Sequence, residues 1–437
     1  MSGVQSRHPS RHGAPRCHSG RGRRSATALA SRVLERPFHP RPKRLINDVA
    51  ASTPQEEAKQ GSVAVVTETL PGTSAVILEK LWLTGFRSHS ELQMEFSPGV
   101  TAIIGPNGSG KTNIVEAIAW LATTRSFRGA PNEALINKSS ETAIARAELR
   151  ADQRSLLLEA ELSRAGRTRI QLNKQKLQRA RDLLGVMGVT VFAPDDLELV
   201  KGSPGTRRTY LDHVLLGLHP RNDALRAEVD KVLKQRNALL KSVGGRLNDD
   251  AAFTLDVWDA KLAAAGDELC AIRAKAIIDL APHVTHALTA VAGHDHVATL
   301  RYNAPWSDSG LATALAASRK DDVRRGVTTV GPHRDDVEIM LNGMPARTHA
   351  SQGEQRSVAL ALRLAGHELV RSTNGVAPLL ILDDVFSELD DDRSTALVKA
   401  LPAGQTLLTS AIDLPPGASA DVVCRLARPA QGGSNGG

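Results

Sequence analysis

The segment "GPNGSGKT", residues 105–112, has the residue types and spacing of a phosphate-binding loop. Its glycines let backbone N–H groups wrap around phosphate oxygens, and a helix that starts directly after the loop adds favourable partial charge. Lys111 would reach the β- and γ-phosphates, and the Thr112 hydroxyl would coordinate Mg²⁺. An apolar run before the loop and a helical pattern after it favour this interpretation over a glycine-rich turn with a chance Lys-Thr pair. The predicted nucleotide contacts are Gly105, Pro106, Asn107, Gly108, Ser109, Gly110, Lys111 and Thr112.

A second segment, "PLLILDD" at residues 378–384, ends an apolar run in two carboxylates. Consecutive apolar residues are typical of a buried parallel strand, and ligands bind at the carboxyl edge of such sheets. Asp383 is therefore predicted to hold Mg²⁺ together with Thr112. Asp384 is predicted to polarise the attacking water, with Lys111 as the second catalytic residue. The alternative is a solvated acidic turn after a core strand.

A third segment, "ASQGEQRSVAL" at residues 350–360, combines a helix start with a glycine that is unfavourable in a helix. Ser351 and Glu354 have the spacing of a capping box. Gly353 permits close backbone approach to an anion, and Ser351 can donate to a γ-phosphate. A phosphate loop, then this segment, then an acidic strand end is the order of the ATP-binding-cassette class, in which the signature segment completes the site of a second subunit. Ser351, Gly353 and Glu354 are therefore predicted to bind nucleotide across a dimer interface.

These segments need elements to position them, and apolar periodicity predicts both strands and helices. Strands are predicted at residues 76–83, 92–96, 100–104, 143–149, 155–162, 168–172 and 186–192, with a helix at 113–121 and tight turns at Asn173-Lys174 and Asn342-Gly343. From residue 202 two amphipathic segments predict a short antiparallel arm with under thirty residues in each helix. The predicted fold is an α/β P-loop NTPase of the ABC/SMC-head type, with a second, mostly helical lobe that carries the arm and the signature helix.

The chain divides by composition into five predicted regions. Residues 1–75 are a basic extension predicted to be disordered, although an organellar transit peptide or a wrongly chosen start codon would look the same. Residues 76–201 and 371–430 form an ATPase lobe, residues 202–370 a helical lobe, and residues 431–437 a flexible tail.

Net charge is +8 over 437 residues, but it is distributed unevenly. Residues 1–44 contain eleven Lys and Arg and one acid, so the remaining chain is nearly neutral and any polyanion site there must be a local basic patch. Three cysteines without a C-x-x-C pair indicate neither a disulfide framework nor a zinc site, which favours the cytoplasm. No run of eighteen apolar residues is present, so no membrane partner is expected.

The three motifs and the segments around them resemble the RecF family of DNA replication and repair proteins. The resemblance covers residues 76 to 415 and includes "GFRSHSELQMEFSPGVTAIIGPNGSGKTNIVEAIAWLATTRSFRG", "FAPDDLELVKGSPGTRRTYLD", "GPHRDDVEIMLNGMPARTHASQGEQRSVALALRLA" and "PLLILDDVFSELDDDR". It implies an ATP- and Mg²⁺-dependent protein that dimerises on gapped duplex or on junctions of single- and double-stranded DNA. It also implies action with RecO and RecR to assist RecA loading. By the same resemblance Ser387, Glu388, Leu389 and Asp390 would form the loop that crosses the dimer interface.

Five arginines are further candidates for contact with phosphates. Arg87 would contact nucleotide or simply face solvent at a strand edge. Local basic pairs make Arg125, Arg128, Arg207 and Arg208 candidate DNA contacts, with solvated surface or a carboxylate partner as the alternative for each. A low aromatic content, 3%, argues against base stacking as the main binding mode.

Departures from the wider cassette class predict slow hydrolysis. Ala193 and Pro194 stand where a glutamine is usual, Thr409 and Ser410 where many cassettes place a histidine, and Asp384 where the base is usually glutamate. We therefore predict a weak, DNA-stimulated ATPase in which hydrolysis acts as a timer for release. A transporter ATPase subunit and a non-hydrolysing nucleotide-gated DNA scaffold remain as alternatives.

Overall fold

The structure is a computed structural model that describes residues 76–293, 295–414 and 417–427. All described residues belong to one compact unit. The predictions for residues 1–75 and 431–437 lie outside the described residues. Within the described part, no helix is long and apolar enough to cross a membrane.

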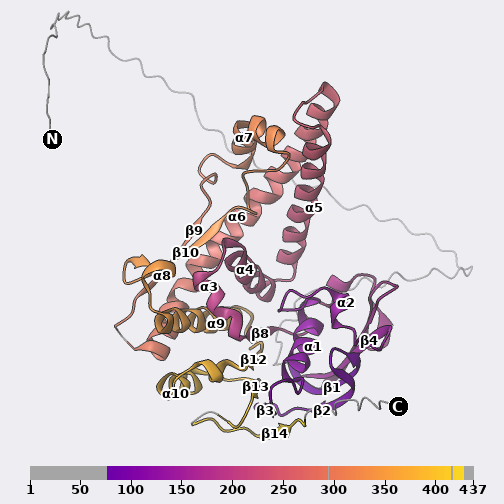
Figure 1. Cartoon of the computed structure of the whole chain (residues 1–437), viewed down its shortest axis with the longest axis vertical. Coiled ribbons are helices and arrows are strands. Elements are labelled where there is room, and N and C mark those ends of the chain that lie inside the picture. Colours follow the sequence, from indigo (N-terminus) through magenta and orange to yellow (C-terminus); the bar gives the residue numbers. More distant parts are fainter. Residues whose placement is uncertain (1–75, 294, 415–416, 428–437) are drawn as a thin grey trace, which may run out of the picture. The chain divides into compact units, whose positions relative to one another are not determined.

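A parallel sheet of five strands carries the phosphate loop and the acidic strand end (Figure 1). Its order is β14 (Val422–Arg425), β3 (Val100–Ile104), β13 (Thr406–Ser410), β12 (Leu379–Asp383) and β8 (Val189–Phe192). Both faces are buried, which explains why β12 is apolar up to Asp383 and why β3 and β13 show no alternation of buried and exposed residues. The two motifs therefore meet at the carboxyl edge of one sheet.

An antiparallel sheet lies next to the parallel one and shares a core with α1 (Lys111–Thr123). Its order is β2 (His89–Glu95), β1 (Val76–Phe86), β4 (Thr142–Ala151), β5 (Arg154–Ser163), β6 (Arg169–Leu172) and β7 (Gln175–Lys176). The short helices α2 (Asn132–Leu135) and η1 (Ala180–Leu183) belong to the same part. Ile103, Ile381 and Leu407 face this core from the parallel sheet.

Helices cover the other face of the parallel sheet, where Ile104, Leu382 and Leu408 point into a second core. This layer contains η2 (Pro194–Leu197), α3 (Glu198–Lys201), α4 (Pro204–Leu218), α5 (Arg221–Ser242), α6 (Asp249–Ala292), α7 (Leu311–Arg325), α8 (Ala346–His349), α9 (Gln352–Asn374), η3 (Val385–Glu388) and α10 (Asp391–Ala400). A small sheet of β9 (Ala298–Asn303), β10 (Asp336–Leu341) and β11 (Met344–Pro345) packs among them.

The arm is formed by α5 and the first half of α6, as predicted, but the predicted helix lengths were wrong for α6. That helix has 44 residues and continues through Pro282, whereas α5 has 22. The extra length packs against α9, and its apolar positions Leu280, Val284 and Leu288 are buried in the helical core. Contacts with the body therefore sustain the helix beyond the arm. The predicted lobe boundary after residue 370 falls inside α9.

Candidate nucleotide-binding site

The phosphate loop joins the end of β3 to the start of α1, as predicted. Gly108 and Gly110 have φ angles of 83° and 96°, a region that side chains with a Cβ rarely adopt. A Cβ at Gly110 would also lie 2.5 Å from His89 Nε2, and one at Gly105 would lie 2.7 Å from the Leu426 carbonyl oxygen. Gly105 and Gly110 are thus held between the start of β2 and the segment that follows β14, and only glycine fits at these two positions.

Polar groups inside this loop fit a phosphate ligand. Lys111 is buried, and its Nζ donates to the carbonyl oxygens of Gly105 at 2.6 Å and Pro106 at 3.2 Å. Ser109 Oγ is buried without a hydrogen-bond partner among the described residues. A buried polar atom without a partner costs roughly 1–3 kcal/mol, so a ligand oxygen at this position would be stabilising.

Asp383 lies at the end of β12 and is brought to the first turn of α1. Its Oδ1 accepts hydrogen bonds from Thr112 Oγ1 at 3.1 Å and from Thr409 Oγ1 at 2.8 Å. Burial raises the pKa of Asp383, and the two hydroxyl donors and the charge of Arg128 oppose that rise. A hydroxyl and a carboxylate side by side are oxygen ligands of the kind Mg²⁺ prefers. The residues therefore fit Mg²⁺ as predicted for Thr112 and Asp383.

Asp384, the predicted water-polarising residue, follows directly in a left-handed conformation with φ 52°. Its backbone N–H donates to Thr409 Oγ1 at 2.9 Å. This fully buried hydroxyl therefore contacts both Asp383 and Asp384, which we call the acid pair. The sequence pattern singled out Thr409 only because many cassette ATPases have a histidine at this position. Its role follows from strand order, because β13 pairs with β12 and places Thr409 opposite Asp383.

We expect Thr409→Val to lower ATP turnover about tenfold, because it removes hydrogen bonds worth roughly 1–3 kcal/mol at the acid pair. Thr409→Ser keeps the hydroxyl and should restore most of the activity. The measurement is phosphate release as a function of Mg²⁺ concentration, where the valine variant should also need more Mg²⁺. Wild-type Mg²⁺ dependence in the valine variant would show that Thr409 has a packing role only.

The signature segment begins α9 with the predicted capping box. Glu354 N–H donates to Ser351 Oγ at 3.3 Å, and Ser351 N–H donates to Glu354 Oε2 at 2.7 Å. Hydrogen bonding of the Glu354 carboxylate to the side chain and backbone of Ser351 lowers the pKa of Glu354. At Gly353 a Cβ would lie 2.6 Å from Arg393 Nη2, so in this chain the glycine makes room for an arginine of α10.

The predicted interface loop, residues 387–390, is tied to the signature helix and to the acid pair. Arg356 Nη2 of α9 lies 2.8 Å from Glu388 Oε2. Ser387 Oγ donates to the Asp384 carbonyl oxygen at 2.8 Å, and Asp390 caps α10. Leu389 lines a small apolar pocket with Pro194 and Leu360.

Figure 1 shows α9 and α1 on opposite sides of the parallel sheet, and their buried residues belong to different cores. One chain therefore brings the phosphate loop and the acid pair together, while its signature segment belongs to the other layer.

Arg87 is placed beside α1 and not on the phosphate loop. Its Nε and Nη2 donate to the two carboxylate oxygens of Glu116 at 2.9 and 2.8 Å, and its Nη1 donates to the Ala134 carbonyl oxygen at 2.9 Å. Glu116 is fully buried and also accepts a short hydrogen bond from Ser126 Oγ. Contact between Arg87 and nucleotide stays a prediction. Arg87 would have to give up its hydrogen bonds to Glu116 and Ala134 to make this contact.

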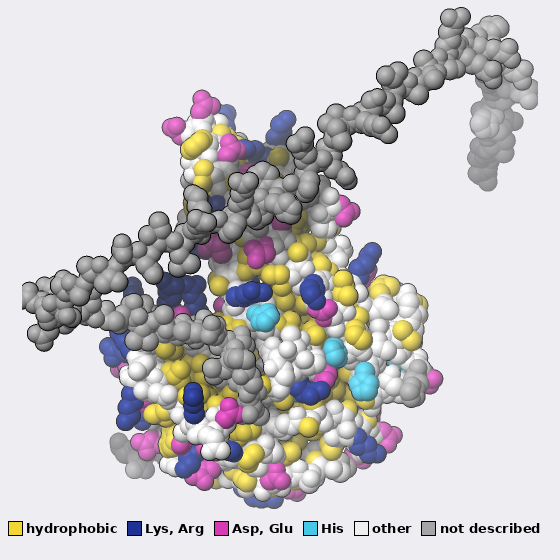
Figure 2. All heavy atoms as spheres, turned by 180° about the vertical axis from the view of Figure 1, so that it is seen from behind, with side chains coloured by type: hydrophobic (Ala, Val, Ile, Leu, Met, Phe, Trp, Pro, Cys, Tyr) yellow, Lys and Arg dark blue, Asp and Glu magenta, His cyan; other side chains and the backbone are white. Residues whose placement is uncertain are grey.

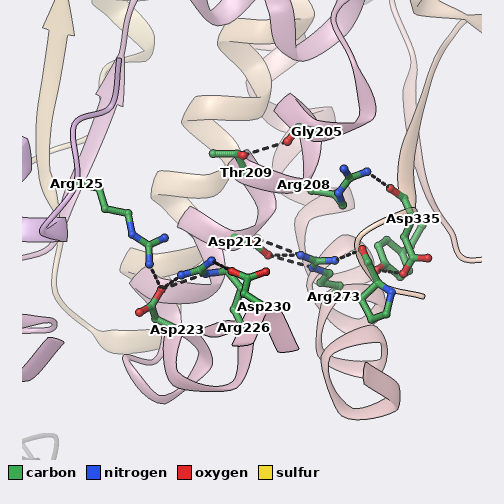
Figure 3. Close-up of polar contacts among 12 residues, drawn as sticks. Arg125, Gly205, Arg208, Thr209, Asp212, Asp223, Arg226, Asp230, Arg273 and Asp335 are labelled. Atoms are coloured by element: carbon green, nitrogen blue, oxygen red, sulfur yellow. Dashed lines mark hydrogen bonds and ion pairs between the residues drawn. The ribbon is translucent and has the colours of Figure 1, made fainter. Parts of the chain in front are cut away.

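The four candidate DNA arginines have different surroundings. Arg207 is buried and forms a bidentate ion pair with the half-buried Asp336 at 2.7 and 2.9 Å, so we correct its assignment from a DNA contact to an internal ion pair. Arg208 donates to the Asp335 carbonyl oxygen at 2.6 Å, and burial lowers its pKa (Figure 3). Arg125 pairs weakly with Asp223, at 3.3 Å. Arg128 is exposed near Asp383 and forms no ion pair with another described residue.

Comparison with known proteins identifies the group to which this architecture belongs. The family model for the RecF/RecN/SMC N terminal domain matches residues 77–411. The DNA replication and repair protein RecF of Acidothermus cellulolyticus is 42% identical over 351 residues, covering 77% of this chain and 94% of that protein. The chain belongs to the RecF family.

RecF of Streptomyces avermitilis is similar to a comparable extent, with 43% identity over 349 residues that cover 76% of this chain and 93% of that protein. A solved structure of the recombination mediator protein RecF with ATP has a TM-score of 0.75 at 29% identity, covering 82% of this chain and 97% of that one. These matches confirm the predicted P-loop ATPase fold and place the chain among the RecF proteins of DNA replication and repair.

Proposed function

We propose that this chain is an ATP-driven DNA clamp of recombinational repair, active in the cytoplasm as a dimer. The observation that carries the proposal is that the phosphate loop and the signature segment lie in different layers of the same chain. Residues 105–112 and Asp383 lie together at the carboxyl edge of the parallel sheet, where they would form a cradle that holds Mg²⁺-ATP, while the signature tip Ser351 belongs to the opposite layer. A second chain would bring its own tip onto the bound triphosphate.

Hydrolysis would release such a clamp. Asp384 would polarise the attacking water, with Lys111 and Mg²⁺ neutralising charge on the phosphates. The loop at residues 387–390 contacts both Asp384 and α9, so it would couple the state of one site to the dimer interface. DNA contact would come from the exposed basic groups Arg128 and Arg125, with the half-buried Arg208 of α4 as a further candidate.

The partners that fit this role are gapped duplex or junction DNA, together with RecO and RecR, and the outcome would be assisted loading of RecA. Family membership supports this assignment. A transporter subunit is not supported, because the family match covers most of the chain. The remaining alternative is a scaffold that binds ATP and does not hydrolyse it.

The test combines phosphate release with binding to gapped duplex in Mg²⁺-ATP, in Mg²⁺-ADP and without nucleotide. We expect wild-type turnover below about 10 s⁻¹, a common enzyme value, with stimulation by DNA. Asp384→Asn should lower turnover at least about 100-fold, because a positioned base contributes that much, while ATP-dependent DNA binding persists.

Asn113→Ala serves as the control, since Asn113 lies next to the cradle and donates to Ser88. DNA binding that does not change with nucleotide would contradict the clamp. Absence of phosphate release from the wild type would favour the scaffold.

A further inference from the structure

The far edge of the antiparallel sheet is unusually basic. Residues 162–181 contain seven Lys and Arg and no Asp or Glu, within a globular part that is otherwise nearly neutral. They include β6, β7 and the start of η1. We call the five members Arg167, Lys174, Lys176, Arg179 and Arg181 the basic edge; all five are exposed.

Local folding places these charges on the solvent side. Ile170 is buried in the core of the sheet, so the alternate positions Arg169 and Gln171 point outward. Lys176 pairs with Gln171 across β6 and β7 and shares that outward face. The turn at Asn173 and Lys174, with φ 51° and 66°, adds a further lysine to it.

Ion pairing on this sheet stops where the basic edge begins. Basic side chains of the other strands face acids across the ladder, as Lys80 does Glu95, and as Arg146 does Glu159. On β6, Arg169 still reaches Glu161. None of the five side chains of the basic edge forms an ion pair with a described residue.

We propose that the basic edge binds the phosphate backbone of a nucleic acid. This rests on the proposed function, because it assigns a surface to the DNA that the clamp would hold. Figure 2 shows several dark-blue side chains at the left margin of the body, the side on which the antiparallel sheet lies. Unpaired Lys and Arg on one exposed face are the electrostatic footprint of phosphate binding, which releases counterions and needs no base contact.

Protection of an edge strand is the simpler explanation for lysines on β7, because a charge there prevents pairing with another sheet. It accounts for Lys174 and Lys176. It does not account for Arg179 and Arg181, which follow the strand. The nearest acid in sequence, Asp182, accepts from the backbone N–H of Arg179 and forms no ion pair with either arginine side chain. Five exposed cations without a pairing acid among the described residues point to a polyanionic ligand.

The test is the salt dependence of binding to gapped duplex in Mg²⁺-ATP, using the full chain. Each lost phosphate contact lowers the slope of log K against log salt by about 0.9. We expect Lys174→Gln with Lys176→Gln to lower the slope by about 2. The matched control is Arg146→Gln with Arg150→Gln, which removes the same charge from the same sheet at groups already paired with Glu159 and Glu79.

A slope that falls in the lysine variant and stays unchanged in the control supports the proposal. An unchanged slope in both variants overturns it, and the basic edge would then suit an acidic protein surface. If the wild type itself fails to bind DNA, the proposed function fails. The two failures are therefore distinguishable.

Discussion

Ser351→Arg is expected to abolish ATP-dependent dimerisation. Ser351 lies at the tip of α9, where its small hydroxyl accepts from the Glu354 backbone. Arginine would lose this cap, which is worth about 1 kcal/mol, and would project a long cation beside Arg393, whose guanidinium already covers Gly353. In the composite site this bulky side chain would hold the tip away from the triphosphate of the second chain, and a loss of about 3 kcal/mol corresponds to at least about a hundredfold weaker dimer.

Analytical ultracentrifugation with ATP, ADP and no nucleotide measures the effect. Wild type should become dimeric with ATP only, and the variant should stay monomeric while still binding one ATP through its intact cradle. Ser372→Arg introduces the same side chain at an exposed position near the end of the same helix and should dimerise normally. A Ser351→Arg chain that dimerises like wild type would remove the composite nucleotide site.

Arg236→Met is expected to lower the free energy of unfolding by about 3–5 kcal/mol, the usual cost of removing one partner from a buried ion pair. Arg236 is fully buried in α5 and pairs with Asp259 of α6 at 2.6 Å and with the fully buried Asp322 of α7 at 2.7 Å. Its Nη1 also donates to Thr328 at 2.8 Å. Methionine would leave Asp322 charged and without its cation where α7 packs against the arm.

Urea unfolding, followed by tryptophan fluorescence and by hydrogen exchange of α5 and α7, measures this loss. Lys231→Met is the control, because Lys231 and Glu228 form an exposed pair on the same helix, and such pairs contribute at most about 1 kcal/mol. Equal midpoints for the two variants would show that the buried cluster does not hold the arm. Both variants should still bind ATP, because the phosphate loop leads into α1, which packs in the core of the antiparallel sheet and not in the helical layer.

Local patterns predicted the elements that depend on neighbouring residues. The phosphate loop, the apolar run ending in Asp383 and the turn at Asn342 carry their conformation in a few adjacent side chains, and the structure has each of them. The capping box at Ser351 belongs to the same group. Such features need no knowledge of which strands become neighbours.

Features that depend on distant pairing could not be predicted in this way. The partner of Arg207 is Asp336, 129 residues away, and the contact of Thr409 with Asp383 requires the order of the parallel strands. Strand β9 and helix α7 were not predicted, because their apolar patterns are weak. Pairing of β9 with β10 and packing of α7 against α6 stabilise them in the fold. The full length of α6 likewise follows from its packing on α9.

The order of the parallel sheet has a consequence for how the protein is made. Strand β3, which leads into the phosphate loop, lies between β13 and β14, the last two strands of the described residues. The loop's first glycine packs against the carbonyl of Leu426. During translation, the phosphate loop emerges from the ribosome long before these neighbours exist. The phosphate loop therefore reaches its final form only after β14 has been released, and pairing so distant in sequence makes this a slow step of folding.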